Sequence, residues 1–529
     1  MLTGETLHQP GMALRDVNRS GSIKRIWILG IPAAGAAAVL LAATPHGIGI
    51  YPDSVMYIMM ARSLLQGQGW TMGGLPVELF PPLYPALLAL GGLFGTDPAD
   101  AARWIQAGIW GVNVFWAGFI AYRFSGESLA AALLCCAVTL GAVDLIAYQT
   151  VALSEGSYLF FLLPSLLLLK RYFDDGRKSD LVFAAALTAL AGVTRYAGLA
   201  AIAGGVLSIL LLEPKALTAR IKNAALFGFV GASLPVGWMI RNLHYETPMG
   251  RRFDVHGFLG RQEVAGILNA CAAWFLQWKI PDAWWMFILP PGFVLVLLFW
   301  TRSAVRHTPP AQSRLLILLW IYMAAYAALL VVSAAFFQAD LFRDSSRILM
   351  PLHVLLLLVG VVSGYRWSMR ADTPAIRVPL AFISFGAALL VLVSGVEYAK
   401  KVSGDAQGYA SRPYRTSELI ERSRSIPPGI TVYTNLMLPV ALYTGRITYR
   451  IPMKVTNSTQ RENDTYDEEM RSMAGDIRDS SALLLYFNRT PKWFVLPTVD
   501  EIGHYVPLRC VAKEPDGAVY EAVQDTTEE

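Results

Sequence analysis

The sequence predicts a polytopic α-helical membrane protein that carries a small α/β domain at its C-terminal end. Of its 529 residues, 54% are hydrophobic and only 16% are charged, whereas soluble domains average roughly 25% charged residues. Apolar runs close to the roughly 20 residues that cross a bilayer recur up to about residue 396. We therefore expect a cytoplasmic N-terminal tail (1–25), a membrane domain (26–397) and an extracytoplasmic α/β domain (398–529).

The basic residues are spread over short loops between the apolar runs, although the net charge is +5. They form no single stripe of the kind that binds nucleic acid, so we expect no nucleic-acid partner. The four cysteines show no metal-binding spacing, and Cys135 and Cys136 fall inside an apolar run. We interpret them as packing residues and leave open a disulfide between Cys271 and Cys510.

The first apolar stretch, residues 26–44, is interpreted as a retained membrane anchor. It follows four basic residues, Arg15, Arg19, Lys24 and Arg25. It is too long for a typical signal-peptide core, and no convincing small-residue cleavage site follows it. The basic flank should stay in the cytoplasm, which places Asp53 on the outer side.

The apolar runs predict about eleven spans, at residues 26–46, 103–122, 128–148, 155–171, 181–194, 196–213, 223–240, 284–302, 314–334, 348–365 and 378–396. The run 82–95 is only about 14 residues long and is bracketed by prolines and a glycine, so we expect an interfacial or re-entrant helix there. With this run outside, five basic loops fall on the cytoplasmic side, as the positive-inside rule requires.

The C-terminal region has the pattern of a mixed α/β domain. Short strand-like stretches occur at residues 431–435, 446–450, 482–487 and 493–497. Helix-like segments at 416–425 and 466–474 lie between them.

Several ionisable residues lie where an outer loop joins an apolar helix, namely Asp53, Glu155, Arg195, Arg241 and Arg347. Desolvation makes such a group costly unless it is paired or used. The set suits a reaction at the outer membrane surface, in which cations hold an anionic group and a carboxylate takes a proton. Two structural alternatives stay open: Asp53 caps the helix that starts at Ser54, and Arg195 pairs with Glu155.

An ordered series of motifs resembles the GT-C fold of polyprenyl-phosphate-dependent glycosyltransferases, the superfamily of protein O-mannosyltransferases and lipid A aminoarabinose transferases. The first outer loop carries it most clearly, in YPDSVMYIMMARSLLQGQGW followed by ELFPPLYPALLAL. Further matches are LSEGSYLFFLL (153–163), LAGVTRYAGLA (190–200), GWMIRNLHYETPMG (237–250) and SSRILMPLHVLLLL (345–358). The resemblance covers most of residues 26–396.

This resemblance implies roles for individual residues. Asp53 matches the catalytic carboxylate, Glu155 matches a second acidic position, and Arg195, Arg241 and Arg347 match cations near the lipid-linked phosphate. Substrate contacts are implied at Tyr57, Glu78, Tyr84, Asn242 and Arg343. Glu78 also resembles a metal-binding residue of some members, but His244 and His256 are partners only by topology. The cofactor therefore stays open between none and a divalent metal ion.

The implied reaction transfers a sugar from a polyprenyl-phosphate donor to an acceptor outside the inner (plasma) membrane. It needs one base and fixed positive charge but no nucleotide, which agrees with the absence of a Gly-rich phosphate loop from the sequence. A single displacement would invert the anomeric centre. A glycan, a lipid and a protein all remain open as acceptors. Two alternatives are kept: a transporter or flippase of a lipid-linked or anionic substrate, and a membrane-anchored binding protein.

Overall fold

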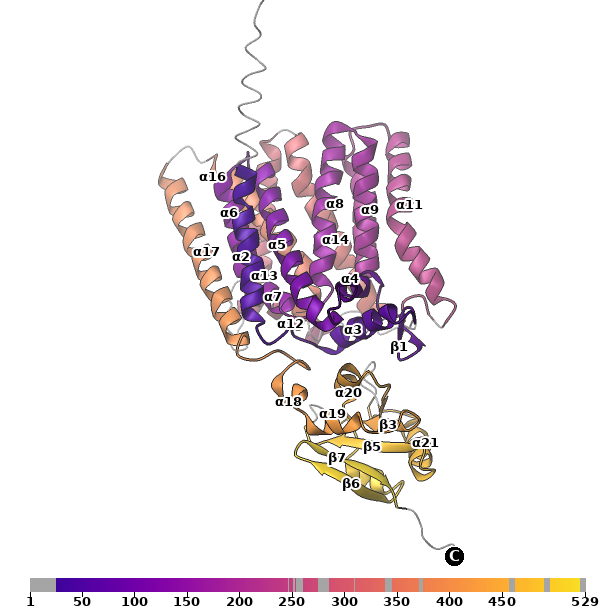
Figure 1. The fold of residues 1–529 in the computed structure, drawn as a ribbon. Helices are drawn as coiled ribbons and strands as arrows, with labels where there is room; N and C mark the ends of the chain where they lie inside the picture. The colour runs from indigo at the N-terminus through magenta and orange to yellow at the C-terminus, as the bar shows by residue number, and fades with distance from the viewer. Residues whose placement is uncertain are drawn as a thin grey trace, which may run out of the picture.

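The computed structural model describes residues 25–245, 247–250, 253, 260–274, 285–308, 310–337, 345–370, 374–455, 462–489 and 495–523. Long helices run side by side and form one thick layer (Figure 1). A smaller domain that contains a β-sheet lies at one end of this layer, beside short helices of the first outer loop. This arrangement is that of the predicted fold class, a polytopic helical membrane protein with a small C-terminal α/β domain.

The helices of the layer follow the apolar runs of the sequence. They are α2 (Gly30–Ala43), α5 (Pro98–Phe124), α6 (Leu129–Gly141), α7 (Val143–Gln149), α8 (Glu155–Asp175), α9 (Lys178–Thr194), α10 (Gly198–Leu212), α11 (Leu217–Asn242), α12 (Arg261–Ala273), α13 (Trp285–Arg306), α14 (Pro310–Phe336), α15 (Ser345–Ile348), α16 (Met350–Ser368) and α17 (Pro374–Val402). Most of their buried apolar side chains form one continuous core, which includes Trp110, Leu163 and Leu358, and a smaller separate cluster contains Ala270 and Leu330.

Seven helices in the described part of the chain are long and apolar enough to cross a membrane, or eight if the pair α6 and α7, bent by 62°, is one span. The number of about eleven predicted spans is thus not confirmed. Helices α9 and α10 have 17 and 15 residues, fewer than a straight crossing needs. The chain is nevertheless a multi-pass membrane protein by these helices.

The segment between α2 and α5, which the sequence predicts to be the first outer loop and which keeps that name below, is built from short elements at one end of the helix layer. These are α3 (Pro52–Leu65), β1 (Thr71–Met72), β2 (Leu75–Pro76) and α4 (Leu83–Gly92). Strands β1 and β2 pair antiparallel as a small hairpin. Helix α4 has only 10 residues, in agreement with the expectation that the run 82–95 does not cross the membrane.

The C-terminal domain is a sheet with helices around it. Its elements are α18 (Arg412–Arg415), α19 (Glu418–Ser423), β3 (Thr431–Thr434), α20 (Met437–Thr444), β4 (Tyr449–Arg450), α21 (Tyr466–Arg478), β5 (Ala482–Phe487), α22 (Val499–Gly503), β6 (Leu508–Glu514) and β7 (Gly517–Ala522). The strand order is β4-β3-β5-β7-β6. Strand β3 is parallel to β4 and β5, whereas β7 is antiparallel to β5 and β6.

One expectation about this region is wrong, and one alternative that was left open is excluded. Residues 495–497 of the strand predicted at 493–497 lie in a turn and irregular backbone, and the rest of that stretch is outside the described residues. The disulfide left open between Cys271 and Cys510 is absent, because both thiols are free.

The C-terminal domain is attached directly beside the start of α3. The Ile50 amide donates to the Gln407 carbonyl at 3.1 Å, and the Tyr409 amide donates back to the Ile50 carbonyl at 2.7 Å. Gly408, between these two, has φ +61°, and a Cβ there would lie 2.2 Å from the Ile50 carbonyl oxygen. Only glycine fits this backbone position without strain. The linker therefore fixes the domain within a few residues of Asp53.

Candidate active site

Asp53 lies in the first turn of α3, at the end of the helix layer nearest the C-terminal domain. Pro52 occupies the first helical position, where its missing N–H costs no hydrogen bond, and Tyr51 is the N-cap residue. The Tyr51 amide donates to Ser54 Oγ at 3.1 Å. Asp53 is therefore not the helix cap, and its carboxylate, 33% exposed, points to another partner.

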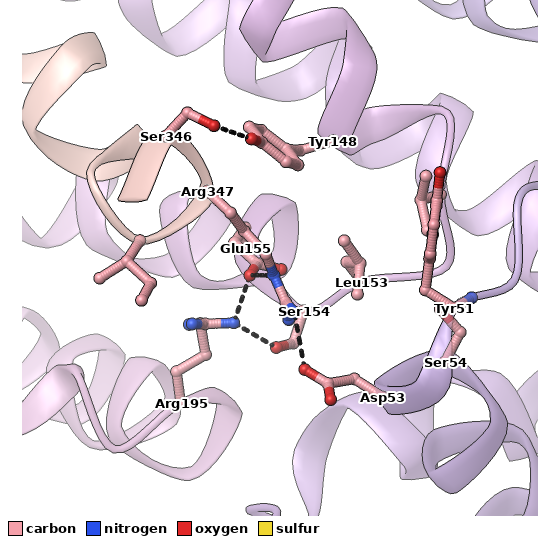
Figure 2. Close-up of polar contacts among 12 residues, drawn as sticks. Tyr51, Asp53, Ser54, Tyr148, Leu153, Ser154, Glu155, Arg195, Ser346 and Arg347 are labelled. Atoms are coloured by element: carbon pink, nitrogen blue, oxygen red, sulfur yellow. Dashed lines mark hydrogen bonds and ion pairs between the residues drawn. The ribbon is translucent and has the colours of Figure 1, made fainter. Parts of the chain in front are cut away.

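That partner is Arg347, which connects Asp53 to Glu155. Arg347 Nη1 donates to Asp53 Oδ2 at 2.7 Å, and its Nε donates to Glu155 Oε1. Arg195 Nη1 also lies 2.7 Å from Glu155 Oε1. Figure 2 shows these four side chains converging from separate elements. Two carboxylates and two guanidinium groups thus form one paired cluster, which we call the Asp53 cluster.

Arg195 occupies the break between α9 and α10. Its backbone is extended, with φ −149° and ψ 140°, so the helix ends at Thr194 and the Arg195 side chain turns into the cluster. Arg195 Nη1 also donates to Ser154 Oγ at 3.1 Å. The predicted pairing of Arg195 with Glu155 is therefore present, and it does not exclude a role toward substrate.

Amide side chains of α5 hold the loop that carries Ser154 and Glu155. Gln106 Nε2 donates to the carbonyls of Val151 and Leu153 at 3.0 and 2.8 Å. Two turns further along α5, Asn113 Nδ2 donates to the Gly156 carbonyl at 2.9 Å. Sequence reasoning missed these two amides. The signal was available, because two polar residues seven positions apart share one face of an apolar helix.

Arg347 belongs to the short helix α15, which two tyrosines fix in place. The Tyr148 hydroxyl is hydrogen-bonded to Ser346 Oγ, the residue before Arg347 (Figure 2). The Tyr326 hydroxyl donates to the Ile348 carbonyl at 2.8 Å, one residue after it. The guanidinium is thus held in place from both sides rather than left on a free loop.

Burial divides the cluster into an inner and an outer part. Glu155 is 1% exposed, whereas the side chains of Arg195, Arg347 and Asp53 are 19%, 24% and 33% exposed. Burial opposes the charge of Arg347, but the adjacent Glu155 and Asp53 carboxylates outweigh it and raise the pKa of Arg347. Glu155 Oε2 has no hydrogen-bond partner among the residues described. Asp53 is therefore the carboxylate that a molecule from solution can reach.

Tyr57 and Tyr84, which contact each other, are almost completely buried. The Tyr57 hydroxyl is 3.0 Å from Ser154 Oγ, and its ring meets the Tyr84 ring edge-on at 5.0 Å. Burial, together with the nearby Asp53 carboxylate, raises the pKa of Tyr57, so its hydroxyl stays protonated. These contacts support the loop at Ser154. Direct substrate contact by either tyrosine stays a prediction.

Glu78, Arg241 and Asn242 form a second cluster, at the end of α11. Glu78 Oε2 accepts from the Thr247 amide at 2.9 Å and from the Thr247 hydroxyl at 3.1 Å. Arg241 Nη1 donates to the Val77 carbonyl at 3.0 Å, and Asn242 Nδ2 donates to the Glu78 carbonyl at 3.2 Å. The Arg241 guanidinium also lies over the rings of Trp238 and Tyr245. This group fastens the first outer loop to α11.

The remaining predicted contacts are not brought into the Asp53 cluster. Arg343 and His256 lie outside the described residues. His244 is placed by a contact between its Nδ1 and the Ile240 carbonyl at 3.1 Å. Within the described chain, no group of three or more His, Cys, Asp or Glu side chains could hold a metal ion. The metal role of Glu78 stays a prediction.

Most of the chain is similar in fold to several solved structures. ArnT from Cupriavidus metallidurans in the apo state is 14% identical, with 94% of this chain and 98% of that chain covered and a TM-score of 0.59. The same protein bound to undecaprenyl phosphate is 15% identical, with the same coverage and a TM-score of 0.58. The apo oligosaccharyltransferase from Archaeoglobus fulgidus is 11% identical, with 96% and 75% covered and a TM-score of 0.51.

The arabinofuranosyltransferase AftD from Mycobacteria gives a TM-score of 0.54 at 14% identity. There the match covers 94% of this chain but only 40% of that chain. No protein-family model matches the chain, and a search of curated proteins found no match. At these low identities the similarity shows the fold, and the predicted GT-C fold is confirmed.

Proposed function

We propose that this protein is an integral-membrane glycosyltransferase that moves a sugar from a polyprenyl-phosphate donor to an acceptor, with inversion at the anomeric carbon. The observation that carries the proposal is the Asp53 cluster. A partly exposed carboxylate and two arginines meet at the end of the helix layer nearest the C-terminal domain. The fold of ArnT, which was solved with undecaprenyl phosphate bound, supports the same type of donor.

In this proposal Asp53 acts as the general base. The acceptor hydroxyl loses its proton to the Asp53 carboxylate as its oxygen bonds to the anomeric carbon. The bond from that carbon to the phosphate oxygen breaks, and its electron pair stays on the polyprenyl phosphate. Asp53 Oδ2 is oriented by Arg347, while Oδ1 has no protein partner among the described residues and can take the proton.

The arginines stabilise the negative charge that develops on the leaving phosphate during the reaction. The phosphodiester donor has one negative charge, and the polyprenyl monophosphate that leaves approaches two. Arg347 and Arg195 therefore bind the transition state more tightly than the bound donor, which is the condition for an electrostatic contribution to the rate. Arginine suits this role because its planar guanidinium binds two phosphate oxygens at once.

Glu155 acts through the two arginines. It is buried and holds both guanidinium groups through one oxygen, Oε1. We assign it a positioning role within the site rather than direct proton transfer. The Arg241 and Asn242 contacts likewise support the outer loop, and phosphate binding by Arg241 is retained as a prediction of the sequence.

We also propose an orientation of the protein in the membrane. The N-terminus is cytoplasmic, and Asp53, Glu155 and residues 398–529 lie outside the plasma membrane, as the positive-inside rule predicts. Single cysteines introduced at Arg220 and Ile430 of a cysteine-free variant test it on intact cells. An impermeant reagent should label position 430 and leave position 220 unlabelled; the reverse pattern would overturn the orientation.

The activity itself is tested with purified full-length protein and labelled polyprenyl-phosphate sugars. The donor is first identified by mass spectrometry of lipids from a deletion strain, where the unused polyprenyl-phosphate sugar should accumulate. Transfer from that lipid to an envelope acceptor fraction, with release of polyprenyl phosphate, is the expected result. Movement of the intact lipid-linked sugar across the bilayer without transfer would instead identify a flippase.

A further inference from the structure

A basic cavity lies at the opposite end of the helix layer from Asp53. Helix α8 carries Glu155 at its first residue and Lys170 and Arg171 near its other end, and at about 1.5 Å per residue these are more than 20 Å apart. The cavity has a volume of about 530 Å³ and lies between the ends of α5, α8 and α16. These ends point away from the C-terminal domain (Figure 1).

Cationic side chains dominate the lining of this cavity, with two carboxylates among them, Asp174 and Asp175. The five cationic residues are Arg123, Lys170, Arg171, Arg177 and Arg366. Lys170 is 8% exposed, is paired with Asp174, and lies over the Phe124 ring with its Nζ 5.2 Å from the ring centre. Arg366 Nε donates to the Phe124 carbonyl at 2.7 Å, which ties α16 to the end of α5. The basic character is therefore built into the packing of three helices.

The cationic side chains at the rim of the cavity are available to a ligand. Arg123 pairs with Glu127 at 3.0 Å and Arg171 with Asp180 at 3.8 Å, and each arginine is 49% exposed. The Arg123–Glu127 pair is exposed on both sides, so it contributes little and can be exchanged for a stronger anion. The Asp180 side chain, in contrast, is only 9% exposed. Within the described chain, Arg177 is exposed and has no ion-pair partner. A phosphate group could thus recruit Arg123 and Arg177 without breaking a buried pair. Arg171, which lies 3.8 Å from Asp180, could bind the same phosphate while staying beside that carboxylate.

Two apolar residues of the lining lie nearer the middle of their helices than the neighbouring cations do. Phe119 lies one turn before Arg123, and Leu167 lies one turn before Lys170 and Arg171. Both residues fall inside segments predicted to lie in the membrane. The volume is that of a site for a molecule of several tens of atoms rather than for a single small ion. Apolar side chains next to a basic rim match a lipid whose phosphate lies at the headgroup level.

From these features we infer that the cavity binds the phosphate headgroup of an anionic membrane lipid. The rim arginines Arg123, Arg171 and Arg177 contact the phosphate, and Phe119 and Leu167 contact the start of an acyl chain. A soluble phosphate compound would present the same phosphate group to these arginines. This site is independent of the sugar transfer proposed above, because it uses none of the residues of the Asp53 cluster.

Native mass spectrometry of the full-length protein in detergent micelles tests this inference. Phosphatidylglycerol, phosphatidylcholine and inorganic phosphate are titrated separately. Wild-type protein should retain phosphatidylglycerol at least about tenfold more tightly than phosphatidylcholine. The variant R123Q/R171Q/R177Q should lose about tenfold to a hundredfold in phosphatidylglycerol affinity, since each removed cation weakens attraction to an anionic headgroup. Inorganic phosphate should compete weakly.

The matched control is R302Q/R306Q/K222Q, which removes three charges from helix ends outside the cavity. It should bind phosphatidylglycerol as wild type does. Equal retention of the two lipids, or equal losses in both triple variants, would overturn the inference. Inorganic phosphate that binds as tightly as the lipid, with the same loss in the first variant, would assign the site to a soluble phosphate and overturn the lipid assignment. The single variant Arg177→Gln, at an exposed and unpaired position, repeats the test if the triple variant does not fold.

Discussion

The Arg347 guanidinium lies 2.7 Å from the Asp53 carboxylate, although 294 residues separate the two in the chain. The same guanidinium binds Glu155, so it joins α3, α8 and α15 at a single point. A molecule with a phosphate group that approaches Arg347 would therefore meet a carboxylate already oriented beside it.

Replacing Asp53 by Asn should leave the fold intact and slow sugar transfer by about 10²- to 10⁴-fold, the usual contribution of a positioned general base. Asn keeps the shape and can still accept from Arg347, but it cannot take the acceptor proton. Transfer by purified protein with a saturating labelled donor measures the effect. The matched control is Asp100→Asn, an exposed carboxylate in the first turn of α5, which should transfer normally. Normal transfer by Asp53→Asn would remove Asp53 from catalysis.

Replacing Glu155 by Ala should destabilise the protein by about 3–5 kcal/mol, because two partly buried guanidinium groups would lose their shared carboxylate. Thermal unfolding in detergent, followed by tryptophan fluorescence, measures this loss. Glu127→Ala removes a carboxylate from an exposed pair with Arg123 and should change the stability by less than about 1 kcal/mol. Equal decreases in melting temperature in the two variants would contradict the claim that Glu155 stabilises the two guanidinium groups.

Arg347→Ala should lower kcat/KM for the donor by about tenfold or more, and Arg347→Lys should fall between Ala and wild type. The lysine ammonium is a point charge that cannot bind two carboxylates, or two phosphate oxygens, in the fixed geometry of a guanidinium. Steady-state kinetics with varied donor lipid give the comparison. Wild-type kinetics for the alanine variant, with an unchanged melting temperature, would show that Arg347 does not hold the phosphate.

Substitutions of Glu78 separate the loop-positioning role that its contacts with Thr247 support from the metal-binding role that the sequence predicts. Glu78 Oε2 accepts both hydrogen bonds from Thr247, and an amide oxygen can do the same. If Glu78 positions the outer loop, Glu78→Gln should keep most of the activity and Glu78→Ala should lose it. If Glu78 binds a metal ion, Gln and Ala should be equally inactive, and a chelator should inhibit wild type until a divalent metal is restored.

Gly408→Ala should disturb the joint between the C-terminal domain and the start of α3. The new Cβ would meet the Ile50 carbonyl oxygen at 2.2 Å, at a backbone φ of +61°. The unfavourable φ alone costs about 1–2 kcal/mol, and the clash adds to it, so both the melting temperature and sugar transfer should fall. Gly404→Ala is the control, because its Cβ would find only the Lys401 carbonyl, at 3.9 Å. A normal melting temperature for Gly408→Ala would show that the linker adapts.

Much of the architecture could be predicted from local patterns. Apolar runs predict the long helices, and the short run bracketed by Pro81, Pro82 and Gly95 predicts a helix too short to span. The domain boundary expected near residue 398 stays a prediction, since α17 continues to Val402. Both helix predictions depend on burial or chain stiffness over neighbouring residues. The strand expected at 493–497 failed because β-propensity depends on a pairing partner, and residues 495–497 lie in a turn rather than beside another strand.

The sequence by itself also determined which residue types collect at the helix ends near Asp53, because an ionisable group is costly inside a membrane. It could not determine which of them meet. Arg195, Arg241 and Arg347 had the same local signature, yet two of them bind Glu155 while Arg241 holds carbonyls of the outer loop. Only the tertiary structure decided this, since the partners of a charged side chain are set by how distant helices pack, and no local pattern records that packing.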